Sequence, residues 1–162
     1  ARPRVLIGGL GIGFTLRAAL GAFPKDVSLT VAELVPAVVA WGRGPMAALF
    51  GSSLDDPRVT IIEEDVGKVM RGARFDAILL DVDNGPEGLT RIANDRLYDM
   101  EGLAAARASL YPGGLLAVWS CWADKGFTER LKKSGFAVEQ KMVRAHKGQS
   151  GAKHTVWLAA KR

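Results

Sequence analysis

VLIGGLGIG, residues 5–13, joins an apolar run to the helix-forming residues FTLRAAL that follow it. This order indicates a strand, a tight glycine turn and a helix, in which backbone N–H groups can approach a bound nucleotide or nucleoside closely. The glycines follow a G-x-G-x-G pattern, and Phe14 stands where a dinucleotide fingerprint that starts at Gly9 would place its third glycine. No Lys-Ser or Lys-Thr pair follows, which excludes a P-loop. The alternative is a turn that serves only strand-to-helix packing.

Length and composition indicate one ordered domain over residues 1–162. The lone Cys121 excludes a disulfide framework and a zinc cluster, so we expect a reducing, cytoplasmic location and no metal. No apolar stretch reaches the ~18–20 residues of a membrane span, so no membrane partner is expected. The net charge of +5 is concentrated after residue 123. A solvated basic face is favoured over a nucleic-acid partner, because no aromatic-basic interleaving accompanies these charges.

Apolar runs and helix-forming stretches alternate along most of the chain. The pattern predicts strands at 5–7, 27–32, 58–62, 75–80 and 115–120, and helices at 13–22, 37–50, 99–110 and 124–134. The helix at 37–50 should loosen at the Gly42-Arg43-Gly44-Pro45 stretch. Two final strands, 136–143 and 155–160, have no helix between them and are therefore predicted to be antiparallel. The fold class is α/β: a doubly wound, mostly parallel seven-stranded sheet with helices on both faces and a C-terminal antiparallel hairpin.

Acidic residues follow several of these strands, at the sheet edge where open α/β sheets bind ligands. Glu33 follows the second strand, twenty residues after Gly13, where a carboxylate can accept hydrogen bonds from both ribose hydroxyls. A carboxylate favoured by a helix N-terminus is the alternative for Glu33, and both roles can hold. Asp65 and Val66 follow the third strand, where a helix cap is an equally good interpretation.

Asp81, Asp83 and Asn84 follow the fourth strand, just before Gly85-Pro86. Two carboxylates and an amide at the mouth of a parallel sheet suit a site that binds a cation or takes a proton from an amine. We expect Asp81 to be the general base or amine anchor, with Asp83 and Asn84 orienting the acceptor. The alternative is a turn stabilised by side-chain caps.

The glycine pattern resembles motif I of the class I S-adenosylmethionine-dependent methyltransferases. Within that superfamily the chain resembles the spermidine/spermine synthase (polyamine aminopropyltransferase) branch. The resemblance rests on the stretches VLIGG at residue 5, VAE at 31, DPRV at 56, FDAILLD at 75, GP at 85, LY at 97 and LYPGG at 110. It implies the class I methyltransferase (Rossmann-like) fold and a transferase of polyamine biosynthesis.

The resemblance also implies roles for individual residues. Gly9, Gly11 and Gly13 would wrap the amino-acid and sulfonium part of S-adenosylmethionine or its decarboxylated form. Asp65 would reach the adenine amino group, with Val66 against the ring. Asp81 matches the first aspartate of a D-x-x-D-P-type signature, which accepts the proton of the attacking amine and adjoins the cofactor. Asn84 stands at the second acidic position, and Gly85 replaces the proline.

The implied reaction transfers an aminopropyl or methyl group to a small amine or polyamine acceptor. The resemblance also implies an N-terminal β-domain that helps to form the polyamine pocket and the oligomer. We expect residues 1–162 to contain none of that domain, and a homodimer is a further expectation. Two alternatives stay open: a methyltransferase acting on RNA or a small molecule, and a non-catalytic binding module that retains the fold.

Overall fold

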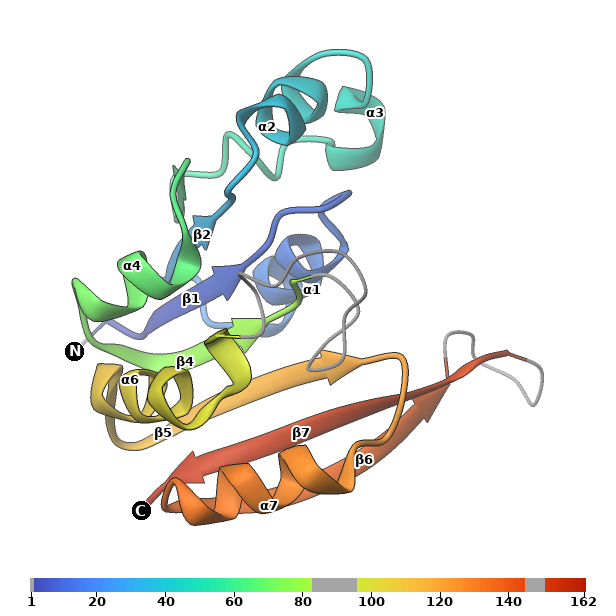
Figure 1. Cartoon of the computed structure of the whole chain (residues 1–162). Helices are drawn as coiled ribbons and strands as arrows, with labels where there is room; N and C mark the ends of the chain where they lie inside the picture. The colour runs from blue at the N-terminus through green and yellow to red at the C-terminus, as the bar shows by residue number, and fades with distance from the viewer. Residues whose placement is uncertain (1, 83–95, 145–150) are drawn as a thin grey trace.

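The computed structural model describes residues 2–82, 96–144 and 151–162 (Figure 1). These residues form a seven-stranded sheet in the order β3-β2-β1-β4-β5-β7-β6. Its strands are β1 (Arg4–Gly8), β2 (Ser28–Ala32), β3 (Val59–Ile62), β4 (Phe75–Leu80), β5 (Leu110–Ser120), β6 (Phe136–Arg144) and β7 (Lys153–Lys161). The helices are α1 (Phe14–Ala22), α2 (Pro36–Arg43), α3 (Ala47–Phe50), α4 (Val66–Arg71), α6 (Met100–Ser109) and α7 (Lys125–Lys133). None of these helices combines the length and apolarity needed to cross a membrane.

The predicted fold class is confirmed. Strands β1 to β5 pair in parallel, and β7 runs antiparallel to both β5 and β6. The strand order reverses at β1, which pairs with β2 through Ile7 and Val31 and with β4 through Ile7 and Leu79. A reversal of this kind opens a crevice at the carboxyl ends of the strands, the usual ligand position in such sheets.

Helices cover both faces of the sheet because successive side chains of a strand point to opposite sides. In β1, Val5 and Ile7 belong to a core that includes residues of α1, α2 and α3. Leu6, between them, belongs to a second core that α4, α6 and α7 complete. Figure 1 shows α4, α6 and α7 together in front of the sheet, with α1 behind it. The glycine turn after β1 therefore follows a strand that is packed on both faces, one core on each side of the sheet.

Two predicted boundaries need correction. The single helix expected at 37–50 is two helices, because α2 ends at Arg43 and α3 begins at Ala47. The break at residues 44–46 overlaps residues 42–45, where the helix was predicted to loosen. The fifth strand begins at Leu110 instead of residue 115. Its pairing with β4 jumps from Phe75↔Leu110 to Ala77↔Leu115, so the Tyr111-Pro112-Gly113-Gly114 stretch forms an irregularity inside the strand, with Gly113 at φ 77°.

Candidate functional site

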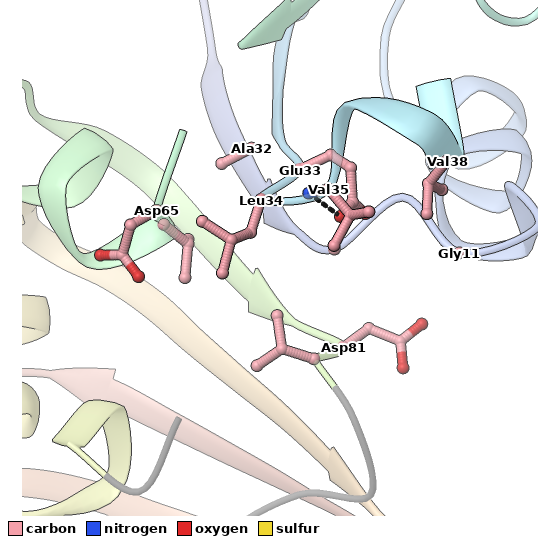
Figure 2. A pocket seen from close by; sticks show the side chains of 11 residues that line it. Gly11, Ala32, Glu33, Leu34, Val35, Val38, Asp65 and Asp81 are labelled. Atoms are coloured by element: carbon pink, nitrogen blue, oxygen red, sulfur yellow. Dashed lines mark hydrogen bonds between the residues drawn. The ribbon is translucent and has the colours of Figure 1, made fainter. Parts of the chain in front are cut away.

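A cavity of about 290 Å³ lies at the carboxyl ends of β1, β2 and β4, beside the start of α4 (Figure 2). Six of the predicted site residues line it, and they come from four separate loops. The complete lining consists of Gly9, Gly11, Ala32, Glu33, Leu34, Val35, Val38, Asp65, Val66, Asp81 and Val82. Gly13 is not part of the lining, and the predicted residues Asp83 and Asn84 lie outside the described residues.

Gly9 closes one side of the cavity against the end of β4. A Cβ atom on Gly9 would lie 2.6 Å from the Asp81 carbonyl oxygen, and its φ of 88° is unfavourable for other residues. The Gly9 N–H donates to the Ala32 carbonyl at 2.9 Å, and the Asp81 N–H donates to the Gly8 carbonyl at 3.1 Å. The glycine turn therefore joins the ends of three strands without side-chain bulk between them.

Gly13 has a different role from Gly9 and Gly11. It is the N-cap of α1, with φ 78°, and a Cβ atom there would lie 2.6 Å from Cε1 of Phe50 in α3. The third glycine of the pattern thus allows α1 and α3 to approach each other. Its position accounts for its absence from the cavity lining.

Glu33 is buried, with 8% of its surface exposed, and both carboxylate oxygens accept backbone hydrogen bonds. Oε2 accepts from the Leu10 N–H at 2.9 Å, and Oε1 accepts from the Val35 N–H at 2.8 Å. Val35 is the N-cap of α2, so the carboxylate links the glycine turn to the start of that helix. Each oxygen of an ionised carboxylate has two acceptor sites, which leaves one on each for a ligand hydroxyl.

Asp65 lines the opposite side of the cavity and is the N-cap of α4, where its Oδ1 accepts from the Lys68 N–H at 3.0 Å. The capping interpretation from the sequence is therefore realised, while Asp65 also faces the cavity (Figure 2). Its neighbour Glu64 accepts from the Asp65 N–H at 2.9 Å, and this bond, together with Lys68, lowers the pKa of the Glu64 carboxyl. Val66 adds an apolar surface beside Asp65.

Asp81 is exposed at the rim of the cavity, and its Oδ2 accepts a 2.6 Å hydrogen bond from Oγ1 of Thr15. Thr15 is the second residue of α1, so the first turn of that helix fixes the direction of the carboxylate. Sequence reasoning missed Thr15. The available signal was a hydroxyl residue directly after the glycine turn.

An apolar wall completes the cavity and was also missed. Leu34, Val35 and Val38 extend from the end of β2 into α2, and Val82 faces them from the end of β4. Leu34 keeps 43% of its surface exposed although it is large and apolar. Apolar surface of this kind at a cavity is suited to contact with a flat ring. The signal in the sequence was a pair of apolar residues between Glu33 and Pro36.

Other candidates from the sequence lie elsewhere. Tyr98 is 2% exposed and packs edge-on against Phe127 in the core, and its hydroxyl donates to the Val82 carbonyl at 3.4 Å. Cys121 is half-buried, and His154 packs against Trp119 with ring centroids 5.0 Å apart. The described part of the chain contains no group of three or more His, Cys, Asp or Glu side chains placed to hold a metal ion.

The fold and the position of the cavity define a domain of the class I methyltransferase type. Solved structures share the fold: a spermidine synthase in complex with the transition state analogue AdoDATO (TM-score 0.76, 22% identity) and the spermidine synthase of Thermotoga maritima (0.77, 23%). Both comparisons cover 99% of this chain and 54% of the other. Human methyltransferase-like protein 13 in complex with SAH matches with a TM-score of 0.70 and 17% identity, over 100% of this chain and 73% of that one.

Comparison with curated sequences shows that the chain belongs to the polyamine aminopropyltransferase family, the branch that the motifs indicated. A polyamine aminopropyltransferase of Mycobacterium tuberculosis is 35% identical over 123 residues, which cover 73% of this chain and 22% of the relative. One from Corynebacterium efficiens is 36% identical over 125 residues, covering 74% of this chain and 23% of the relative. The chain thus spans just over a fifth of the length of the curated relatives it matches. No family model matches the chain.

Proposed function

We propose that this domain binds decarboxylated S-adenosylmethionine or S-adenosylmethionine and transfers the aminopropyl or methyl group to a small amine or polyamine. The observation that carries the proposal is the charge of the cavity. Its lining includes the carboxylates of Glu33, Asp65 and Asp81, and no Lys or Arg residue is among the described residues that form it. An acidic cavity suits a cationic sulfonium nucleoside and a cationic amine, whereas the pyrophosphate of a dinucleotide would be repelled.

We assign each part of the nucleoside to a part of the lining, on the chemistry of the residues there. The unused acceptor sites of Glu33 suit the two ribose hydroxyls, because the backbone N–H groups of Leu10 and Val35 already hold the carboxylate in position. Asp65 and Val66 suit the adenine amino group and ring, opposite the apolar wall. The absence of side chains at Gly9 and Gly11 leaves the sulfonium end open toward Asp81. The arrangement favours the decarboxylated form, because that form carries no carboxylate to repel the acidic lining.

Asp81 is the residue that we propose as proton acceptor. The amine nitrogen attacks the carbon next to the sulfonium, the carbon–sulfur bond breaks, and its electron pair goes to sulfur to give a neutral thioether. The proton that the amine loses passes to the Asp81 carboxylate, which Thr15 orients through Oδ2. Because the leaving group is already activated, alignment of the amine and removal of its proton are the main tasks left to the domain. We propose Asp83 and Asn84 as acceptor-orienting residues on the sequence pattern alone.

The first test is calorimetric titration with methylthioadenosine, S-adenosylmethionine and its decarboxylated form. If none of the three compounds binds, the proposal is contradicted. Mass spectrometry of putrescine incubated with the decarboxylated form then detects aminopropyl transfer, and methylated acceptors with S-adenosylmethionine would instead indicate a methyltransferase. Asp81→Asn should retain nucleoside binding and lower the transfer rate on the order of 10²-fold or more. Asp55→Asn, which changes an exposed carboxylate paired with Arg43, is the control.

A further inference from the structure

A second cavity, of about 510 Å³, lies at the opposite end of the sheet from the candidate active site. Arg4 at the start of β1, Arg71 at the end of α4 and Arg74 just before β4 line it, together with Ser109 and Tyr111 at the junction of α6 and β5. In Figure 1 this is the end where the N-terminus is marked and where α4 and α6 lie side by side. We refer to it as the arginine cavity.

The three arginine side chains of this cavity form no ion pair with any carboxylate of the described residues. Within residues 2–82, 96–144 and 151–162, no carboxylate oxygen lies within 4.0 Å of their guanidinium nitrogens, whereas Arg43, Arg58 and Arg130 each pair with an aspartate. Nη1 of Arg71 donates to the Gly67 carbonyl of its own helix, and Arg4 lies over the Phe75 ring at 5.6 Å.

Two further cations strengthen the positive field. Nζ of Lys161 donates to the Leu110 carbonyl at 2.6 Å. Burial lowers the pKa of this lysine, and the positive charges of Arg74 and Arg107 lower it further. Arg74 and Arg107 therefore lie close enough to Lys161 to repel its positive charge. The amino end of the sheet therefore carries a cluster of five cations: Arg4, Arg71, Arg74, Arg107 and Lys161.

Helix dipoles account for part of this cluster. The carboxyl ends of α4 and α6 are at the cavity, and cations stabilise helix carboxyl ends. Each end is equivalent to only about half a negative charge, so the two together offset roughly one cation. Asp76 supplies one more negative charge, with its Oδ2 held by the Arg4 backbone N–H at 2.7 Å. Most of the positive charge is left without a counterpart in the described structure.

We infer that the arginine cavity binds a small anion that carries a phosphate group with at least two negative charges. Guanidinium groups present paired N–H donors that match phosphate oxygens, and three of them line one cavity that is open to solvent. The arginine cavity has positively charged side chains in its lining, whereas the cavity at the other end of β1 and β4 has carboxylates. The inference does not depend on the proposed transferase function.

Titration with pyrophosphate at low ionic strength tests the inference. Pyrophosphate contains no nucleoside, so the result is independent of the candidate active site. Arg71→Gln combined with Arg74→Gln should weaken binding about tenfold or more, since each removes a charge-assisted contact. Arg43→Gln combined with Lys125→Gln removes the same charge away from the arginine cavity, because Arg43 ends α2 and Lys125 begins α7. This pair should leave the affinity unchanged. If the first pair impairs folding, as seen by circular dichroism, Arg74→Gln alone serves, because its side chain has no hydrogen bond or ion pair within the described residues.

Four further outcomes have defined meanings. Equal weakening by both double variants, or no pyrophosphate binding at millimolar concentration, would overturn the inference. ATP is tested with methylthioadenosine saturating the acidic cavity. If ATP then binds more tightly than pyrophosphate, and Arg74→Gln weakens the binding of both, the result would support the inference and identify a nucleotide as the source of the phosphate. Binding of a single-stranded oligonucleotide through these arginines without any binding of pyrophosphate would overturn it in favour of a nucleic-acid surface.

Discussion

The α-carbon of Gly9 lies so close to the backbone of Asp81 that a Cβ atom on the glycine would be 2.6 Å from the aspartate carbonyl oxygen. The two residues follow neighbouring parallel strands, and the contact places the glycine turn beside the proposed proton acceptor. Gly9→Ala should lower the free energy of unfolding by about 2 kcal/mol or more, from the positive φ and the clash together. Thermal unfolding measures this. Gly51→Ala is the matched control, because Gly51 also has a positive φ (55°) but meets nothing within 4 Å; equal losses would show that the contact with Asp81 is unimportant.

Glu33→Gln is expected to weaken methylthioadenosine binding about tenfold or more, since an amide cannot accept as many hydrogen bonds as a carboxylate. The change also places an NH₂ group against one of the N–H donors of Leu10 and Val35, which should cost about 1–3 kcal/mol of stability. Calorimetry and thermal unfolding separate the two effects. Glu63→Gln alters an exposed carboxylate at the same sheet edge and should change neither. Unchanged affinity in Glu33→Gln would contradict the ribose assignment.

Gly13→Ala should destabilise the domain without weakening nucleoside binding by the folded protein. The added methyl group would meet Phe50 at 2.6 Å, which corresponds to overpacking at a cost of about 1–3 kcal/mol. Phe50→Leu in the same chain should recover part of that loss, and a double-mutant cycle measures the coupling. An affinity loss as large as that expected for Glu33→Gln would instead show that Gly13 contacts the cofactor, as the resemblance implies.

Asp56 gives a prediction for the pH dependence of stability. Its side-chain hydrogen bonds with Arg58 lower the Asp56 pKa from 3.8 to about 2. A carboxyl whose pKa is lower in the folded state contributes stability that is present above pH 4 and is lost as the pH falls toward 2. Asp56→Asn should therefore be less stable than the parent at pH 7 and similar to it near pH 2. Urea unfolding at both values measures this, and a difference that persists at pH 2 would contradict the pairing.

The alternating pattern of apolar runs predicted the fold well, because a strand or helix that packs against a core needs apolar residues at a regular spacing in the sequence. It failed at the start of β5, where Pro112 and the two following glycines are typical of a turn, but neighbouring β4 keeps the chain in the sheet through Leu110. The split between α2 and α3 was visible locally, in Gly44-Pro45. Strand order was not predicted, because the pattern within a strand does not specify its neighbours.

Positions in the cavity lining could be predicted where a residue lies within three positions of a strand end, as with Glu33, Asp65 and Asp81. The roles of these residues stay predictions. The contributions of Gly13 and Thr15 depend on long-range contacts, with Phe50 and Asp81 respectively, which nothing in the local sequence specifies. The arginine cavity was also invisible, because Arg4, Arg74 and Lys161 are brought together only by the sheet.

The position of β7 between β5 and β6 affects the order in which the domain can assemble during synthesis. β6 contacts the sheet through β7, so residues 136–144 have no strand to pair with until residues 153–161 have left the ribosome. Trp157, fully buried under α7, also joins the core only at that stage. A nascent chain stopped before β7 would therefore expose the edge of β5 and the apolar side of α7, both of which a chaperone or another unfinished chain could bind.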